Sequence, residues 1–226
     1  MDVRLLNSTP DPERAVAAAA RVCYAPVGAA ELMEIMTDDE VERILRIIMS
    51  SGHLSALEHA SYTFAIDGVS RAMTHQLVRH RIASFNQQSQ RYVSYDDEPT
   101  FIVPPSVAAA PQALAEFTQA CSQAFDAYRA QIDAGIPAED ARYLLPNAME
   151  TKIVVTMNIR ELLHFFSLRC CRRAQWEIRA VGERMLALVA PTAPSIFLDA
   201  GASCRRGPCP EGRMSCGEPY ERIVRE

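Results

Sequence analysis

The chain has 226 residues, of which 49% are hydrophobic and 23% are charged, and its formal net charge is −5. This composition is typical of a globular protein with one good hydrophobic core, and it excludes a disordered or fibrous chain. The negative net charge also argues against a general nucleic-acid-binding protein, which usually carries a basic face and a high pI.

The N-terminal residues lack the basic stretch and apolar run of a secretory signal, and no apolar stretch approaches the roughly 20 residues that cross a bilayer. The number of cysteines is odd, at seven, and Cys23, Cys121, Cys170 and Cys171 fall in segments of expected regular structure. Reduced thiols, a cytoplasmic location and no membrane attachment are therefore expected.

Two helices are predicted near the N-terminus. After an apolar opening at 3–6, Asp11 has the position of an N-cap, and Pro12 and Glu13 follow in the first turn of a helix that continues through an alanine-rich run. A second helix is predicted from about 39 to 50, because its apolar residues recur at helical spacing. Gly52 supplies its stop signal.

A strand and a short helix are predicted next. Apolar and polar residues alternate over 60–66, as in a half-buried strand. Ser70 can cap a helix that runs to about Val78. The cluster Arg79, His80 and Arg81 is then expected where this helix gives way to a loop.

The middle of the chain predicts a linker and two helices. The linker is proline-rich and covers 100–111. A long helix over 114–132 follows and stops near Gly135, and a short helix is predicted from Pro137 to about Leu145.

A second strand is predicted over 152–157 from a run of β-branched residues. Asn158 followed by Glu161 has the form of a capping box, so a helix is expected to begin as soon as this strand ends. A last helix is predicted over 175–189. The residues from 201 onward are rich in Gly, Pro, Arg and Cys.

These elements predict an α+β fold with a mixed or antiparallel sheet flanked by helices. A single domain is expected over 1–200, with a tail rich in Cys and Arg over 201–226. Helices and strands do not alternate as they do in a doubly wound fold. No G-x-G-x-x-G follows a predicted strand, so a nucleotide cofactor would need another kind of binding site.

The densest group of hydrogen-bond donors lies at 79–91. Arg79, Arg81 and Arg91 carry guanidinium groups, which bind phosphate through paired N–H groups, and Ser89 with the loop amides can complete a phosphate cradle. The alternative is that these arginines form ordinary ion pairs at a solvated helix end.

The pattern R-H-R-x7-S in RHRIASFNQQSQRY at 79–92 resembles the signature of the flavin-dependent thymidylate synthases. Similar segments occur in the family's order: GHLSALEHASYTF at 52–64, ARYLLP at 141–146 and TMNIRELLHFFSLRCCRRAQWEI at 156–178. The resemblance therefore covers about residues 1–200 and implies that family's fold.

By this resemblance the chain methylates dUMP to dTMP. FAD is the implied cofactor, 5,10-methylenetetrahydrofolate the carbon donor and NADPH the reductant. The implied assembly is a homotetramer with active sites between subunits, its partners are dUMP and folate small molecules, and neither nucleic acid nor a metal is expected.

The resemblance also implies roles for individual residues. Arg169 matches the arginine placed against the pyrimidine ring as its activator, a role that suits a planar, permanent cation. The positions similar to FAD contacts are Ser55, Arg79, His80, Arg81, Gln87, Asn158, Arg160 and His164. The positions similar to dUMP contacts are Gln76, Arg79, Gln87, Gln88, Ser89, Gln90, Arg91, Arg142 and Arg169.

The chain departs from the family pattern at four positions. Gln87 stands where many members have Glu, and His75 stands where several have Arg. His164 stands where some members have Asn, and Arg173 where some have His. These departures bear on individual flavin contacts and leave the arginines of 79–91 in place.

Two other functions fit parts of the sequence. A non-catalytic nucleotide- or RNA-binding module could use the same arginine segment. A thymidylate synthase with a cysteine nucleophile would need a reactive thiol, for which Cys170 and Cys171 lie beside arginines, but no histidine or acidic base is close in sequence.

The tail carries Cys204, Cys209 and Cys216 in the spacing C-x4-C-x6-C. Three thiolates without an evident fourth ligand are weak evidence for zinc. Free or redox-sensitive cysteines are the expected interpretation.

Overall fold

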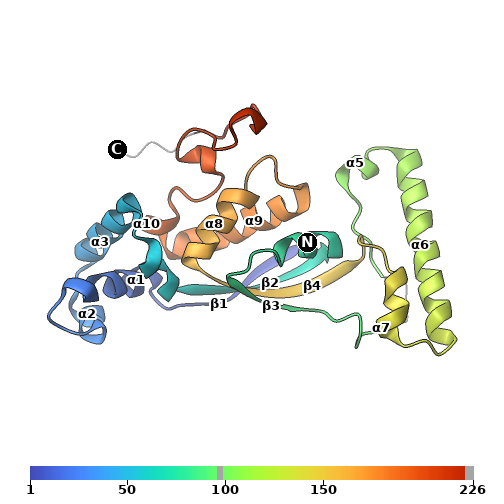
Figure 1. Ribbon diagram of the computed structural model, residues 1–226, viewed down its shortest axis with the longest axis horizontal. Coiled ribbons are helices and arrows are strands. Elements are labelled where there is room, and N and C mark those ends of the chain that lie inside the picture. Colours follow the sequence, from blue (N-terminus) through green and yellow to red (C-terminus); the bar gives the residue numbers. More distant parts are fainter. Residues whose placement is uncertain (96–98, 222–226) are drawn as a thin grey trace. The chain divides into compact units, whose positions relative to one another are not determined.

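The computed structural model describes residues 1–95 and 99–221 (Figure 1). Its four strands form one antiparallel sheet in the order β1-β2-β4-β3. The strands are β1 (Asp2–Ser8), β2 (Ser61–Ser70), β3 (Ala83–Gln87) and β4 (Glu150–Asn158). The predicted α+β class is confirmed, and of the two sheet types expected, the antiparallel one is observed.

The chain divides into two compact units whose boundaries fall mostly within the strands. Unit 1 comprises Met1–Asp2, Ile66–Arg79 and Phe85–Val154, and unit 2 comprises Val3–Ala65, His80–Ser84 and Val155–Glu226. The division into a domain over 1–200 and a tail over 201–226 stays a prediction. Within the described residues, no helix is both long enough and apolar enough to cross a membrane.

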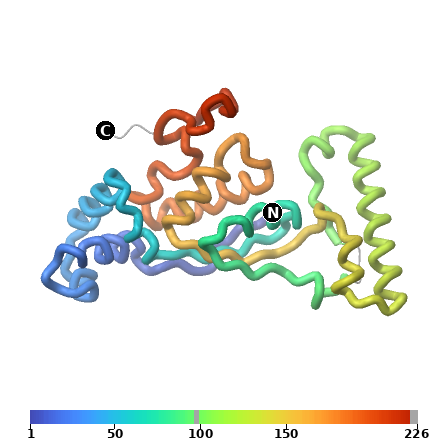
Figure 2. Tube along the Cα trace, viewed as in Figure 1, coloured from blue at the N-terminus to red at the C-terminus, as the bar shows by residue number. Residues whose placement is uncertain are grey.

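Unit 2 begins with three helices: α1 (Pro12–Arg21), α2 (Ala29–Ile35) and α3 (Asp38–Ser51). Helices α1 and α3 lie side by side (Figure 2). The predicted cap of α1 is confirmed, since the Asp11 side chain accepts from the Arg14 N–H. Helix α2 has no counterpart among the predictions because Leu32 is its one buried residue, so the segment shows no apolar stripe.

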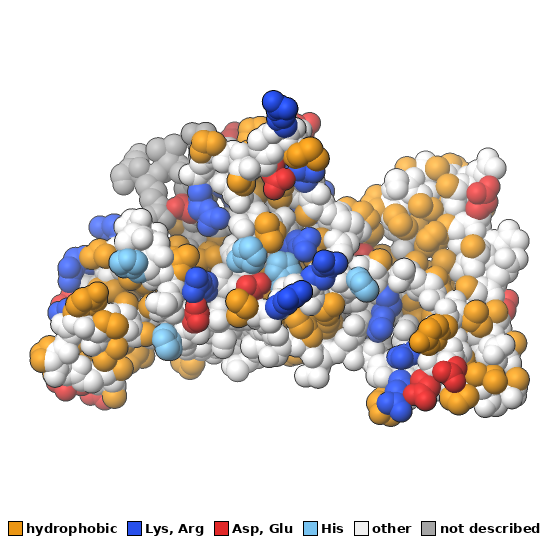
Figure 3. Space-filling view, in the orientation of Figure 1, with side chains coloured by type: hydrophobic (Ala, Val, Ile, Leu, Met, Phe, Trp, Pro, Cys, Tyr) orange, Lys and Arg blue, Asp and Glu red, His pale blue; other side chains and the backbone are white. Residues whose placement is uncertain are grey.

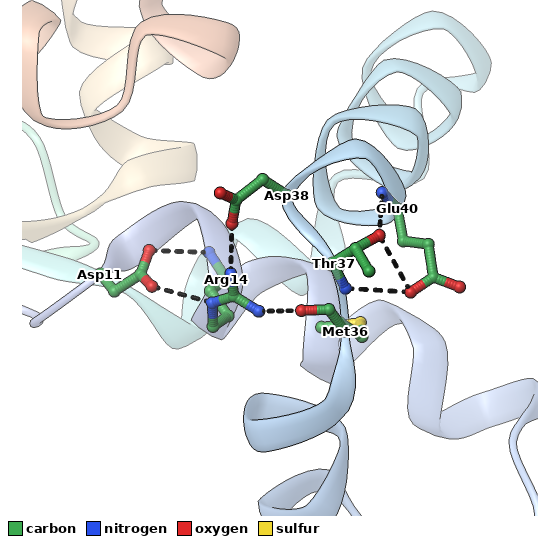
Figure 4. A network of polar contacts seen from close by, with 6 residues as sticks. All are labelled: Asp11, Arg14, Met36, Thr37, Asp38 and Glu40. Carbon is green, nitrogen blue, oxygen red and sulfur yellow. Dashed lines mark hydrogen bonds and ion pairs between the residues drawn. The ribbon is translucent and has the colours of Figure 1, made fainter.

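A polar network joins the starts of α1 and α3 (Figure 4). Arg14 donates to Asp11, to Asp38 and to the carbonyl oxygen of Met36. At the start of α3 the Thr37 hydroxyl accepts from the Glu40 N–H, and the Glu40 carboxylate accepts from the Thr37 N–H. This complete capping box places the helix start at Asp38, close to the predicted 39.

The remaining helices of unit 2 follow β4. They are α8 (Ile159–Arg169), α9 (Trp176–Val189) and α10 (Pro194–Phe197), and α8 and α9 confirm two predicted helices. Helix α8 buries Phe165 and Phe166 and packs against α9 and against the 3-10 helix η2 (Leu54–His59). A Cβ on Gly182 of α9 would lie 3.4 Å from Phe165 and from the Cys170 sulfur, so α9 packs against α8 at van der Waals distance here.

Unit 1 contains α4 (Arg71–Leu77), α5 (Pro105–Ala108), the long helix α6 (Pro111–Asp133), α7 (Ala138–Ala141) and the 3-10 helix η3 (Arg142–Leu144). The predicted cap of α4 is confirmed, because the Ser70 hydroxyl accepts from the Met73 N–H. Helix α6 contributes Phe125 and Tyr128 to a small core with Ala141. The predicted long helix and the short one after Pro137 are confirmed.

Two local predictions, for 100–111 and for the segment after Arg81, were wrong. The linker at 100–111 contains α5, and Phe101 forms a β-bridge with Met149. The loop expected after Arg81 includes β3, which lies at the edge of the sheet. Its sequence, ASFNQ, lacks the apolar alternation of a half-buried strand, so periodicity gave no signal.

Candidate active site

Unit 2 holds a chain of three polar side chains: Glu161, His80 and Arg169. His80 Nδ1 lies 2.9 Å from Glu161 Oε1, and the Arg169 Nε–H donates to His80 Nε2 at 3.0 Å. His80 is 5% exposed and Glu161 is 6% exposed. In the region of α8, arginine and histidine side chains gather on the face that Figure 3 shows.

Helix α8 places two members of this chain on one face. Glu161, Phe165 and Arg169 follow one another at intervals of four residues, which superimposes them along a helix. The Phe165 ring lies 4.9 Å from the His80 ring in an edge-on arrangement. Glu161 in the first turn and Arg169 in the last turn also have the charges that the helix dipole favours.

The neighbours of His80 determine its protonation. A guanidinium has only N–H donors, so His80 Nε2 must carry the lone pair and Nδ1 the proton, which it donates to Glu161. Burial lowers the pKa of His80, and the charge of Arg169 acts in the same direction, while the hydrogen bond to Glu161 opposes it. His80 is therefore neutral at physiological pH.

The ligand atoms of His80, Glu161 and His164 lie within 4.8 Å of one another, which is close enough for a metal ion. A metal would need a lone pair from His80, but Nδ1 carries a proton and Nε2 accepts from Arg169. The cationic guanidinium beside the ring also opposes a second positive charge. The group therefore fits a hydrogen-bonded cluster better than a metal centre.

The tail cysteines form no comparable group of ligand atoms in the described part of the chain. Cys204, Cys209 and Cys216 instead line a cavity of about 290 Å³ in unit 2, together with Cys171. Two ion pairs tie the tail to the segment after α8: Arg172 with Glu218 and Arg173 with Glu211. The departure at Arg173 thus has a structural partner in the tail.

Cys170 is a poor candidate for a nucleophile. Its side chain is buried, and burial raises the pKa of its thiol to about 12. The reactive thiolate is therefore scarce at neutral pH. Cys171 is half-buried and faces the cavity of the tail.

Most of the predicted flavin contacts lie in unit 2. Asn158 caps α8 by accepting from the Glu161 N–H, and Arg160 forms an ion pair with Glu58 of η2. Exposed Ser55 belongs to the same 3-10 helix. The His164 ring lies 6.0 Å from that of His80. Exposed Arg81 directly follows His80, whereas Arg79 and Gln87 belong to unit 1.

Unit 1 contains a cavity of about 220 Å³ between α4, β3 and the segment before β4. Two predicted dUMP contacts, Gln87 and Gln90, contribute to its wall. Gln87 Nε2 donates to the Thr74 hydroxyl at 2.8 Å and to the Thr151 hydroxyl at 3.4 Å. The full lining is Arg71, Thr74, His75, Val78, Gln87, Gln90, Leu145, Pro146 and Asn147.

The hydrogen bonds of Gln87 explain why this chain can have Gln at a position where many family members have Glu. An amide nitrogen donates hydrogen bonds, whereas an ionised glutamate at this position could only accept them. His75, a second departure, lines the same cavity.

Two of the remaining predicted dUMP contacts meet at Glu139. Arg91 Nε forms an ion pair with the Glu139 carboxylate at 2.5 Å, and Arg142 Nε donates to the Glu139 carbonyl oxygen at 3.0 Å. The Ser89 hydroxyl accepts from the Arg91 N–H. The structure thus brings Arg91 and Arg142 together from distant parts of the sequence.

The other predicted positions are simple to place. Gln76 lies in the last turn of α4, and exposed Arg79 follows the C-cap residue of that helix, Val78. Gln88 follows β3, and its carbonyl oxygen accepts from Arg71 Nη1 at 3.2 Å.

Sequence reasoning missed Arg71 and Glu161 as site residues. Arg71 lines the unit 1 cavity, and burial lowers the pKa of its guanidinium. One signal was present: Arg71 is a cation in the first turn of a helix, where the dipole disfavours positive charge. Glu161 was interpreted as part of a capping box, which gave no reason to look beyond its own helix.

Comparison with known proteins agrees with the predicted family. The family model described as thymidylate synthase complementing protein matches residues 4–195. The flavin-dependent thymidylate synthase of Geobacter sulfurreducens is 59% identical and aligns over 100% of this chain and 99% of its own length. The enzyme of the same name from Clostridium tetani is 47% identical, with 97% and 94% covered.

A solved structure supports the same assignment. The UMP/dUMP methylase PolB from Streptomyces cacaoi, bound with 5-Br dUMP, has a TM-score of 0.73 and 30% sequence identity. The alignment covers 87% of this chain and 93% of that chain. The chain described here belongs to the flavin-dependent thymidylate synthases.

Proposed function

We propose that this chain converts dUMP to dTMP with FAD as its flavin, 5,10-methylenetetrahydrofolate as carbon donor and NADPH as reductant. Membership of the family supports the reaction. The observation that carries the proposal is the hydrogen bond between Arg169 and His80, which joins two of the resembling segments across 89 positions of sequence. The nucleotide in the PolB structure supports a pyrimidine monophosphate as substrate.

Arg169 is proposed to activate the pyrimidine ring. Methylation at carbon 5 requires electron density on that carbon, and negative charge then develops on the carbonyl oxygen at carbon 4. A guanidinium stabilises this charge through its N–H groups without giving up a proton. His80 holds the Nε–H of Arg169, so the side chain is positioned before substrate binds.

The polar residues of unit 1 are proposed to bind the nucleotide. Arg91, Arg142 and Arg71 offer guanidinium groups, which suit a phosphate monoester. Gln87 and Gln90 line the cavity with amides, which suit the polar edges of a pyrimidine and its sugar.

The donors of unit 2 fit FAD. Ser55, Arg81, Asn158 and Arg160 supply hydrogen-bond donors and two exposed cations, which match a pyrophosphate, and the rings of His80 and His164 lie next to each other. When bound, the flavin supplies the hydride chemistry that amino-acid side chains lack. The protein residues hold the cofactor and orient it.

The family resemblance supports a homotetramer with active sites between subunits, in the cytoplasm.

Purification and a turnover assay test the proposed function. The purified protein should absorb near the wavelengths of an oxidised flavin, should change its spectrum when dUMP is added, and should form dTMP only with folate and NADPH present. Arg169→Ala should lower turnover by about 1,000-fold or more while FAD stays bound, as expected for loss of a transition-state contact.

Two results would contradict this function. A colourless protein that binds polynucleotides with strong salt dependence would favour the RNA-binding alternative. Unchanged turnover in Arg169→Ala would show that the activating role belongs to another residue.

A further inference from the structure

The proposed reaction leaves the side chain of Glu161 without a role. Glu161 occupies the third position of α8, where a capping box would turn its carboxylate toward the cap residue, as Glu40 does toward Thr37 in α3. In α8 only the other half of the box forms: Asn158 Oδ1 accepts from the Glu161 N–H, while Glu161 Oε1 lies 2.9 Å from His80 Nδ1. The carboxylate therefore acts outside its own helix.

The proton positions make this contact directional. Arg169 Nε can only donate, so the hydrogen bond to His80 Nε2 requires a bare nitrogen there. The carboxylate of Glu161 on the opposite side of the ring accepts the proton of Nδ1 and so favours the tautomer that Arg169 needs. With the proton on Nε2 instead, two N–H groups would face each other.

Burial and packing make the chain of contacts stiff. Glu161 and His80 are nearly inaccessible to water, so no solvent molecule can easily replace either hydrogen bond. The edge-on ring of Phe165 limits rotation of the imidazole. Movement of the Glu161 carboxylate should therefore reach the guanidinium of Arg169 through His80.

We propose that Glu161 is a positioning residue for Arg169, which it holds through His80 so that the planar guanidinium keeps one orientation. This inference depends on the proposed function only because it takes the Arg169 guanidinium as the group that faces the pyrimidine. A displacement of a reacting group by about 1 Å can cost about 100-fold in rate, so the effect belongs in kcat.

A purely structural role for Glu161 and a positioning role require different properties of the side chain. An acid that only stabilises the helix dipole needs its charge near the N-terminus of α8. A positioning residue needs an acceptor oxygen at the distance of His80 Nδ1. Glu161→Asp keeps the charge and shortens the side chain by one methylene group, whereas Glu161→Gln removes the charge and keeps the reach and an acceptor oxygen.

Steady-state kinetics of the FAD-bound protein separate the two roles. Glu161→Asp should lower kcat for dUMP methylation about 10- to 100-fold and change KM for dUMP by less than about 3-fold. Glu161→Gln should retain kcat within about 3-fold, because the carbonyl oxygen still accepts from His80. A larger loss of kcat in Glu161→Gln than in Glu161→Asp would overturn the inference. So would a kcat unchanged in both variants, or a change in KM without a change in kcat.

The matched control is Glu13, which also lies in the first turn of a helix and accepts from another element, through the N–H and hydroxyl of Ser195. Glu13→Asp and Glu13→Gln should leave kcat within about 2-fold of the wild type, since this acid has no contact with the chain of Glu161, His80 and Arg169. Should Glu161→Asp fail to fold, Glu161→Gln decides alone, because loss of its kcat in a folded protein contradicts the inference.

A double-variant cycle tests whether Glu161 acts through Arg169. In an Arg169→Lys background the planar fork is absent, so Glu161→Asp should cost less than about 3-fold in kcat. The same loss of about 10- to 100-fold in that background would show that Glu161 acts independently of Arg169. A wild type that never methylates dUMP would refute the proposed function, whereas an active wild type with the reversed variant order would refute this inference alone.

Discussion

At the scale of single residues, the site relies on polar side chains that satisfy one another away from water. His80 uses both ring nitrogens, one toward Glu161 and one toward Arg169. An unsatisfied buried polar group costs about 1–3 kcal/mol, so each of these contacts also stabilises the protein around the site. The same bonds orient the guanidinium that is proposed to meet the pyrimidine.

The burial of Cys170 gives a prediction about the route of catalysis. With a thiol pKa of about 12, Cys170 is protonated at neutral pH, and Cys171 faces the tail cavity. The double variant Cys170→Ala, Cys171→Ala should keep dUMP turnover within about 3-fold, while its free energy of unfolding falls by about 1 kcal/mol through lost packing. Loss of turnover in a folded, FAD-bound double variant would instead support a cysteine nucleophile.

At the scale of secondary structure, α8 links the sheet to the site. Its N-cap, Asn158, ends β4, its first turn supplies Glu161 and its last residue is Arg169. A rigid helix keeps these side chains in a fixed relation, which a loop of the same length would not do. Helix α4 also supplies a site residue, Arg71. Its positive charge in the first turn of α4 is unfavourable with respect to the helix dipole.

Variants of two helix caps should lose similar stability but differ in FAD content. Thr37→Ala removes the capping box of α3 and Asn158→Ala removes the cap of α8, and each should lower the free energy of unfolding by about 1 kcal/mol. Urea titration measures this loss. Thr37→Ala should keep its FAD content and turnover, because α3 contributes no proposed contact, whereas Asn158→Ala should retain less FAD per chain after gel filtration. Equal FAD content in the two variants would remove Asn158 from the proposed flavin contacts.

At the scale of the whole molecule, the exposed aromatic residues are consistent with assembly. Tyr24, Tyr92 and Tyr143 are each at least 80% exposed in the single chain. Tyrosine is enriched at protein interfaces because it combines a large apolar ring with a polar end. Such side chains are candidates for burial between subunits.

The proposed shared active sites predict complementation between inactive variants. Light scattering should give a mass about four times that of one chain, as four copies require. Arg169→Ala and Arg79→Ala should each be inactive alone, yet mixed tetramers from co-expression should recover part of the turnover if the two arginines of one site come from different subunits. Mixed tetramers without activity would place both arginines of a site on the same chain.

Much of the fold followed from local patterns in the sequence. The spacing of apolar residues predicted α3 and α6, the capping pattern at Asn158 predicted α8, and alternation predicted β2. Capping residues such as Asp11 and Ser70 were interpreted correctly because their hydrogen bonds are made within four residues. Among the described elements, β1, β3, α2, α5 and α10 had no predicted counterpart. Of these, α2 and β3 bury too few apolar side chains to produce a period.

The sequence by itself determined most of the longer helices, two of the strands and, through four ordered segments, the family and the arginines expected to carry its chemistry. These features depend on short-range spacing and on residue type. Only the tertiary structure decided that Glu161 leaves its capping box for His80, that Arg91 and Arg142 share Glu139, and that Cys171 lines a cavity with the tail cysteines. Such contacts join residues far apart in the chain, and a side chain chooses among possible partners only when folding brings one of them within hydrogen-bond distance and removes water.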